Sequence, residues 1–146
     1  MRVKSCVIGV AALLLSGLGA VAPAAAETPL IARVDVSDQK MYVYIETRLA
    51  YTRPVSTGRR AFDTPTGQYK PEWVASMWRS RKYNNAPMPY SVFFHEGYAV
   101  HGTTEVSDLG KPASHGCVRL HPDNAKALFA LVRQYGPSTV RVSIER

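Results

Sequence analysis

The sequence predicts a mainly β domain with one main α-helix near its C-terminus. Short segments of alternating or β-branched residues recur through the 146-residue chain, and each is bounded by Gly, Pro, Asn, Asp or Ser. This pattern is typical of strands joined by turns. Only one stretch, shortly before the C-terminus, repeats apolar residues with helical spacing. No repeat or internal linker divides the chain, so we expect a single domain.

Three strands are expected near the start of this domain. Ile31–Val36 alternates apolar and polar residues, and Met41–Ile45 is β-branched and aromatic. The polar segment Ser37–Lys40 between them predicts a turn, so the two strands should form a hairpin. A third strand is expected over Leu49–Ser56, where Pro54 places it at an edge or near its end.

The middle of the chain contains further turn and strand signals. Thr64-Pro65-Thr66-Gly67 is a turn sequence, and we expect Gln68–Ala75 to resume strand. Ser76–Pro89 contains an Asn-Asn pair and two prolines, which predicts an irregular loop, either a lid beside a site or a plain surface connection. Ser91–His95 and Tyr98–His101 are expected to form a hairpin around a two-residue turn.

The predicted helix begins at Pro122 and Asp123, which suit the first turn of a helix. Gly136 and Pro137 should end it, and residues 140–144 alternate as a closing strand. The apolar stripe of the helix, at positions i, i+3, i+4 and i+7, consists of Ala125, Leu128, Phe129 and Val132.

Residues 1–26 have the organisation of a signal peptide. Arg2 and Lys4 precede an apolar stretch, Val7–Val21, and Ala24-Ala25-Ala26 has the form of a cleavage site. The apolar stretch is shorter than the roughly 20 residues of a membrane span, although an uncleaved N-terminal anchor is the alternative. We therefore expect an exported protein of the periplasm or cell envelope, with one domain over residues 27–146 and no integral membrane span after cleavage.

The chain is basic, with a formal net charge of +7. Positive charge attracts any polyanion, but the sequence contains no nucleic-acid-binding motif. An exported basic protein meets anionic envelope polymers first, so we expect no nucleic-acid partner.

The candidate chemistry lies around Cys117, the only cysteine outside the predicted signal peptide. A free thiol near histidines suggests a nucleophile, because an imidazole base raises the population of the reactive thiolate. A buried structural cysteine is the alternative. Either His101 or His115 can serve as the base on sequence grounds. Gly116 permits unusual backbone angles, and the amides around Gly116 and Cys117 can donate to an oxyanion.

No metal site or cofactor is expected. The chain has four histidines and Cys117, but no CxxC, HExxH or similar ligand pair. We expect His95 and His121 to be surface or strand-end residues.

A set of motifs, in this order, resembles the catalytic domain of the YkuD-type L,D-transpeptidase family. The resemblance covers about Ile31 to Ile144, and it implies a sandwich-like, mainly antiparallel β domain with the helix packed against it. The motifs are Ser56-Thr57-Gly58, Thr64-Pro65-Thr66-Gly67, His101-Gly102 and Ser114-His115-Gly116-Cys117-Val118-Arg119-Leu120.

The resemblance implies a peptidoglycan L,D-transpeptidase. Cys117 would attack the carbonyl of the meso-diaminopimelate in a tetrapeptide stem and release D-Ala. The acyl group would pass to an amine of another stem or of an envelope protein, or to water. His101 would be the general base and acid, and His115 would shape the pocket and assist. The resemblance also implies acylation of Cys117 by carbapenems.

The remaining implied site residues are substrate-binding or oxyanion positions: Ser114, Gly116, Gly102 and Arg119. For Arg119 the alternatives are contact with a substrate carboxylate and a structural ion pair. The aromatic residues Trp78, Tyr83 and Tyr90 either line the substrate channel or belong to the core. A further hypothesis is that charged loop residues recognise the acceptor amine: Glu105, Asp108 and Lys111.

Other readings of the same residues stay open. An L,D-carboxypeptidase or endopeptidase would share the nucleophile and the acyl-enzyme. A non-catalytic peptidoglycan-binding module would need neither Cys117 nor His101. An unrelated cysteine protease would need a Cys-His-Asn/Asp arrangement, for which the sequence has no distinctive signature.

The signal-peptide hypothesis predicts that the exported protein begins at Glu27. N-terminal sequencing or intact mass of the exported protein checks this, and a retained Met1 would contradict it.

Overall fold

The structure is a computed structural model that describes residues 29–146. The signal peptide predicted over residues 1–26 lies outside the described residues. Within residues 29–146, no helix combines the length and the apolar character that crossing a bilayer requires.

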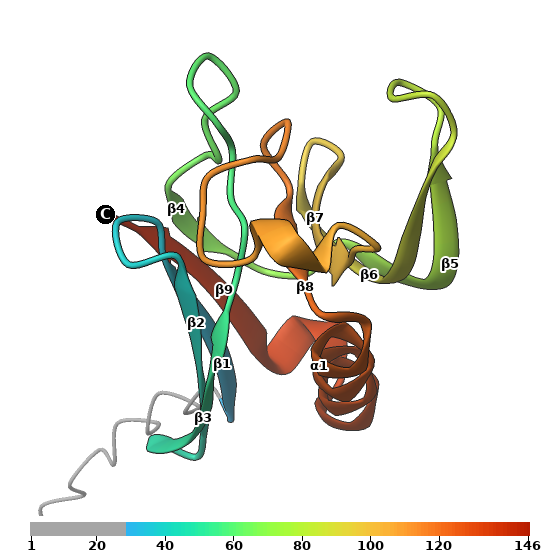
Figure 1. Ribbon diagram of the computed structural model, residues 1–146. Coiled ribbons are helices and arrows are strands. Elements are labelled where there is room, and N and C mark those ends of the chain that lie inside the picture. The colour runs from blue at the N-terminus through green and yellow to red at the C-terminus, as the bar shows by residue number, and fades with distance from the viewer. Residues whose placement is uncertain (1–28) are drawn as a thin grey trace, which may run out of the picture.

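The first of two sheets has five strands in the order β3-β2-β1-β9-β4 (Figure 1). It pairs β1 antiparallel with β2, as the predicted hairpin requires, and parallel with β9. The strands are β1 (Leu30–Asp35), β2 (Lys40–Ile45), β3 (Arg48–Pro54), β4 (Gly67–Tyr69) and β9 (Val140–Glu145).

The second sheet has four strands in the order β5-β6-β7-β8. Its first three strands are antiparallel, whereas β7 and β8 are parallel. The strands are β5 (Trp73–Ser80), β6 (Ala86–His95), β7 (Tyr98–Gly102) and β8 (Val118–Leu120). Two short 3-10 turns, Val106–Asp108 and Pro137–Thr139, interrupt the connections. The prediction of a mainly β, mainly antiparallel two-sheet domain is confirmed.

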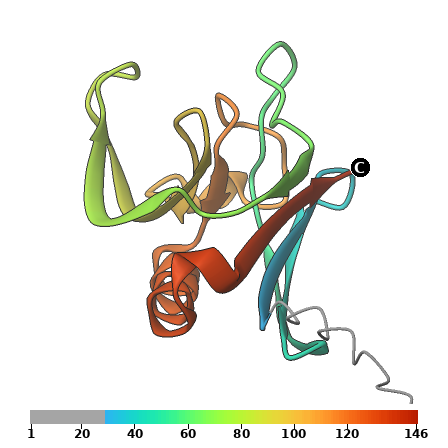
Figure 2. The same ribbon diagram turned by 180° about the vertical axis from the view of Figure 1, so that it is seen from behind.

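Strand alternation places the core between the sheets and the helix. In β1 and β9 every second side chain is buried, which is the period-two pattern of a sheet with one face on the core. The helix α1 (Pro122–Tyr135) packs against β6 and β7 (Figure 2). Its buried residues are the predicted stripe of Ala125, Leu128, Phe129 and Val132.

The prediction of one strand over Gln68–Ala75 is wrong. The chain leaves the first sheet at the end of β4 and enters the second sheet at the start of β5. The break between them contains Pro71, which has no amide N–H for a strand ladder. Alternation alone does not reveal that the two halves belong to different sheets.

The prediction of an irregular loop over Ser76–Pro89 is also wrong. These residues belong to a hairpin in which β5 pairs with β6 as far as Ser80 opposite Ala86. Pro87 and Pro89 lie outside the stretch of β6 that pairs with β7, which includes Val92. With one neighbour strand there, the missing amides are tolerated. We call residues 77–89 the arm, and Figure 1 shows it projecting from the body of the domain.

The parallel pairing of β7 and β8 positions the candidate site. Val100 lies opposite Val118, and His101 lies opposite Arg119. Both valines are buried in the core, so period two turns His101, Cys117 and Arg119 to the other face. The chain after β3 supports this edge, because Ser56 and Arg119 exchange backbone hydrogen bonds of 3.0 and 2.8 Å.

Candidate active site

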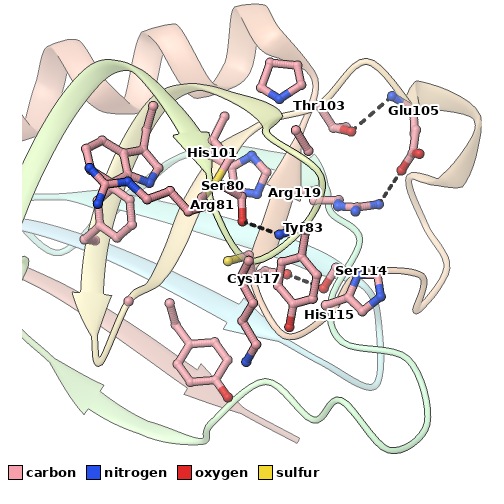
Figure 3. A pocket seen from close by; sticks show the side chains of 18 of the residues that line it. Ser80, Arg81, Tyr83, His101, Thr103, Glu105, Ser114, His115, Cys117 and Arg119 are labelled. Atoms are coloured by element: carbon pink, nitrogen blue, oxygen red, sulfur yellow. Dashed lines mark hydrogen bonds and ion pairs between the residues drawn. The ribbon is translucent and has the colours of Figure 1, made fainter.

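A pocket of about 600 Å³ lies between the arm, the β6–β7 turn and the start of β8. Most of the predicted site residues line it together: His101, Ser114, His115, Cys117 and Arg119. Figure 3 shows these side chains converging from β7, β8 and the segment before β8. Gly102 and Gly116 shape the adjacent backbone instead.

Cys117 is a free, half-buried cysteine. Its side chain packs against a small apolar cluster of Met88, Phe93 and Ala99, with Trp78 beside it. Burial raises the pKa of the thiol, while a backbone hydrogen bond with Ala99 and the charge of Arg119 oppose that rise. The resting group at neutral pH is therefore the thiol, and attack requires a base to remove its proton.

His101 is buried, with 6% of the residue exposed. Its Nδ1 lies 2.7 Å from the carbonyl oxygen of Gly102. A carbonyl only accepts, so Nδ1 carries the proton and Nε2 keeps its lone pair. Burial lowers the pKa of His101 to about 4, with a smaller contribution from Arg119, against the effect of the Gly102 hydrogen bond. The imidazole is neutral at neutral pH and its Nε2 can accept a proton.

His115 has a different environment. Its Nε2 lies 2.6 Å from Nη2 of Arg59, and a guanidinium can only donate. The lone pair of Nε2 is thus already occupied. The ring stacks on Tyr83 of the arm, with centroids 4.3 Å apart, and meets the edge of Phe62 at 4.7 Å. Partial burial, followed by the charges of Arg59 and Arg119, lowers the pKa of His115.

The turn from Ser114 to Cys117 is held by one hydroxyl. Ser114 Oγ donates to the carbonyl of Cys117 at 2.5 Å and accepts the N–H of Gly116 at 3.0 Å. Gly116 adopts φ +111°, and a Cβ there would lie 2.4 Å from Cε1 of Tyr98. Both the conformation and the space therefore require glycine. Ser114 braces the turn, and the amide of Gly116 is bonded within it.

Arg119 forms an ion pair, which is one of the two alternatives expected for it. Its Nη1 lies 2.5 Å from Oε2 of Glu105, which also lines the pocket. Lys111 and Asp108 pair with each other at 3.8 Å and are not among the lining residues. Of the charged loop residues proposed to meet an acceptor, only Glu105 is therefore at the pocket.

Gly102 is a packing position. A Cβ at Gly102 would lie 3.0 Å from Cγ of Pro89 and 3.2 Å from Cα of Pro122. The end of β7 is thus held close to β6 and to the start of α1. The Gly102 carbonyl, as the partner of His101 Nδ1, links this packing to the orientation of the imidazole.

The aromatic residues divide between pocket and core. Trp78 and Tyr83 line the pocket, whereas Tyr90 packs on Phe129 of α1 with ring centroids 5.8 Å apart. Trp73, which sequence reasoning missed, also lines the pocket. Its ring meets that of Trp78, with centroids 5.1 Å apart. The sequence carried no signal for this, because residues five apart lie on opposite faces of a regular strand.

Arg59 and Phe62, the neighbours of His115, were also missed. The only hint in the sequence was a basic residue directly after Ser56-Thr57-Gly58. Which side chain it would approach depends on the pairing of Gly58 with Ser114, a contact between distant segments that local patterns do not reveal.

His95 and His121 lie outside the pocket lining. His95 stacks on Tyr69, with centroids 4.8 Å apart. His121 caps α1, because its Nδ1 accepts the N–H of Asp123 at 3.3 Å. Among residues 29–146, no group of three or more His, Cys, Asp or Glu side chains is placed to hold a metal ion.

Solved L,D-transpeptidases share this fold. The protein described as L,D-transpeptidase (Yku) from Stackebrandtia nassauensis has a TM-score of 0.71 and 25% identity, covering 90% of this chain and 62% of its own. LdtMt1 in complex with imipenem has a TM-score of 0.70 and 24% identity, covering 80% of this chain and 58% of its own. The two-sheet domain is thus of the L,D-transpeptidase class.

The family model for the YkuD L,D-transpeptidase catalytic domain matches residues 29–142, and the chain belongs to this family. The "Putative L,D-transpeptidase YkuD" of Bacillus subtilis (strain 168) is 25% identical over 117 residues, which are 77% of this chain and 64% of that protein. The chain spans about three fifths of the length of these relatives.

Gly116 and Gly110 offer a matched pair of substitutions. Both have positive φ, +111° and +88°, but a Cβ at Gly110 would meet nothing within 4 Å. Gly116→Ala should therefore lower the free energy of unfolding by about 1–3 kcal/mol more than Gly110→Ala, through overpacking against Tyr98. Urea denaturation measures both. Equal losses would show that Tyr98 yields without cost.

The buried His101 predicts a pH dependence of stability. Its folded pKa of about 4 lies below the ordinary 6.5, so between these values the unfolded chain binds more protons. The contribution of the neutral His101 to the free energy of unfolding is fully present above pH 6.5 and is lost as pH falls to about 4. It should amount to roughly 3 kcal/mol, at about 1.4 kcal/mol per pKa unit. Denaturation of the wild type and of His101→Asn across this range measures it, and identical pH profiles would contradict it.

Proposed function

We propose that the protein is a cysteine-dependent peptidoglycan L,D-transpeptidase. The observation that supports this most strongly is the joint presence of a thiol and a buried, neutral imidazole, Cys117 and His101, in one pocket of a domain of this family. A purely binding module would need neither group. The donor substrate is a tetrapeptide stem, in which meso-diaminopimelate is followed by D-Ala.

The first half-reaction starts from two neutral groups. His101 Nε2 accepts the proton of Cys117 as the sulfur attacks the meso-diaminopimelate carbonyl. The backbone N–H of Cys117 stabilises the oxyanion of the tetrahedral intermediate, since the N–H of Gly116 is bonded to Ser114. Collapse breaks the bond to D-Ala, whose nitrogen takes the proton from His101. A thioester on Cys117 remains.

The second half-reaction reverses the roles. An acceptor amine attacks the thioester carbonyl, and His101 accepts a proton from that amine. The intermediate expels the Cys117 sulfur, which is reprotonated, and an amide bond forms. An amine of a second stem gives a 3-3 cross-link, and an amine of an envelope protein attaches that protein to the wall. Water as acceptor makes the same site a carboxypeptidase.

Charge at the pocket suits this substrate class. The pocket is lined by three cations and two carboxylates: Arg81, Lys82 and Arg119 against Glu96 and Glu105. This leaves a positive excess, and stem peptides carry several carboxylates. The signal peptide expected over residues 1–26 would export the protein to the periplasm or cell envelope, where such stems occur. A formal net charge of +7 favours association with the anionic polymers of that compartment.

The first experiment incubates wild type and Cys117→Ala with disaccharide-tetrapeptide and analyses the products by mass spectrometry. We expect a cross-linked dimer with loss of D-Ala, formed by the wild type alone. Disaccharide-tripeptide alone would identify a carboxypeptidase. Circular dichroism of the folded variant is the control, and a product independent of Cys117 would contradict the mechanism.

His101→Ala should slow the reaction by about 10²- to 10⁴-fold.

A β-lactam gives an independent test of the nucleophile. LdtMt1 has been solved in complex with imipenem, and we expect imipenem to acylate Cys117 here. Ring opening by the thiol loses no atoms, so the intact mass should increase by the whole drug. Cys117→Ala should show no adduct. An adduct of equal yield on that variant would place the acylation elsewhere.

A further inference from the structure

A cluster around His115 joins three segments that are distant in sequence. It consists of Arg59, Phe62, Tyr83 and His115, which we call the Arg59 cluster. Arg59 and Phe62 come from the connection between β3 and β4, and Tyr83 comes from the tip of the arm. His115 comes from the turn before β8, and it is a pocket-lining residue.

We propose that Arg59 is a positioning residue that holds His115 as its Nδ1–H tautomer, so that His115 offers the substrate a hydrogen-bond donor and not a base. The tautomer follows from the 2.6 Å contact between Arg59 Nη2 and His115 Nε2. Arginine has five N–H donors and no acceptor, so Nε2 must be the acceptor. The neutral ring then carries its proton on Nδ1.

Arg59 is itself fixed by its surroundings. Its backbone N–H donates to the carbonyl of Ser114 at 3.0 Å, and its Nη1 donates to the carbonyl of Ala113 at 3.2 Å. The guanidinium lies 4.6 Å from the ring centroid of Phe62, within the range of a cation–π contact. Both hydrogen bonds go to the segment that contains His115, so Arg59 is anchored to the same backbone that carries the His115 ring.

The charges facing His115 keep the ring neutral. Arg59, Arg119 and Lys82 all disfavour a proton on it, and Glu105 alone favours one. Partial burial acts in the same direction as the cations. Tyr83 on one side and Phe62 at the edge add no charge and restrict the ring in space.

This tautomer gives the two pocket histidines different roles: His115 can donate a hydrogen bond, and His101 can accept a proton. Within residues 29–146 the structure records no hydrogen-bond partner for His115 Nδ1, and the residue faces the pocket. An N–H there suits a carbonyl, carboxylate or oxyanion of the bound stem. This part of the inference rests on the proposed function. His101 is then the only pocket histidine with a lone pair free to take the Cys117 proton.

Nitrogen NMR of the histidine rings in the purified protein tests the tautomer without any assay of activity. We expect His115 to show a protonated Nδ1 and a bare Nε2 at neutral pH. In Arg59→Met the ring should shift towards the Nε2–H form, and its pKa should rise towards the ordinary 6.5. Arg60→Met, at the adjacent exposed position, should leave the His115 signals unchanged. An Nε2–H form in the wild type, or unchanged signals in Arg59→Met, would overturn the proposal.

Kinetics on the donor stem test the role. Arg59→Met should lower kcat roughly ten- to a hundredfold, the effect of losing one hydrogen bond to a charged group, with a smaller change in KM. Arg59→Lys keeps a donor and should recover part of both the NMR signature and the rate. Loss of rate in Arg59→Met with an unchanged His115 tautomer would reduce Arg59 to a structural role. If the wild type itself forms no transpeptidation product, the proposed function fails while the tautomer test still stands.

Discussion

Hydrogen bonds between the parallel strands β7 and β8 join two segments that are separated by a loop and a 3-10 turn. This pairing sets His101 opposite Arg119, and period two then places Cys117 on the same face of the sheet. The opposite face is closed by Val100 and Val118, which are buried in the core. Any slip of one residue in this register would send the thiol into the core and a valine into the pocket. The geometry of the site therefore depends on the core packing of Val100 and Val118 on the opposite face.

Hydrogen bonds from two other segments support the backbone around this pairing. The chain after β3 bonds to β8 through Ser56 with Arg119, and to the segment before β8 through Thr57 with Ser114. Gln39, from the first hairpin, is buried against Thr57 and bonds to both its hydroxyl and its amide. The first sheet thus supports the site in the second sheet through polar contacts. Buried polar groups of this kind require complete pairing, which fixes one arrangement of the loops.

Much of this architecture could be predicted from local patterns, because period and turn chemistry are local properties. The first hairpin, the helix stripe ending in Val132 and the β6–β7 hairpin were all confirmed. The split between β4 and β5, and the arm with its two prolines, could not be predicted, because they depend on which strands become neighbours. The same distinction holds for the site. The motifs identified five of the residues that line the pocket, among them Cys117 and His101, whereas the contact of Arg59 with His115 arises from chain pairing at long range.

The raised pKa of Cys117 also affects how readily the sulfur is oxidised. Peroxides and disulfides react with the thiolate, and a group that stays protonated reacts slowly with either. Among residues 29–146 Cys117 is the only cysteine, so it has no disulfide partner in that part of the chain. The apolar cluster of Met88, Phe93 and Ala99, against which Cys117 packs, keeps the sulfur as the protonated thiol, which oxidants attack least. In the proposed mechanism the thiolate forms only when a substrate carbonyl and the His101 imidazole are aligned with the sulfur.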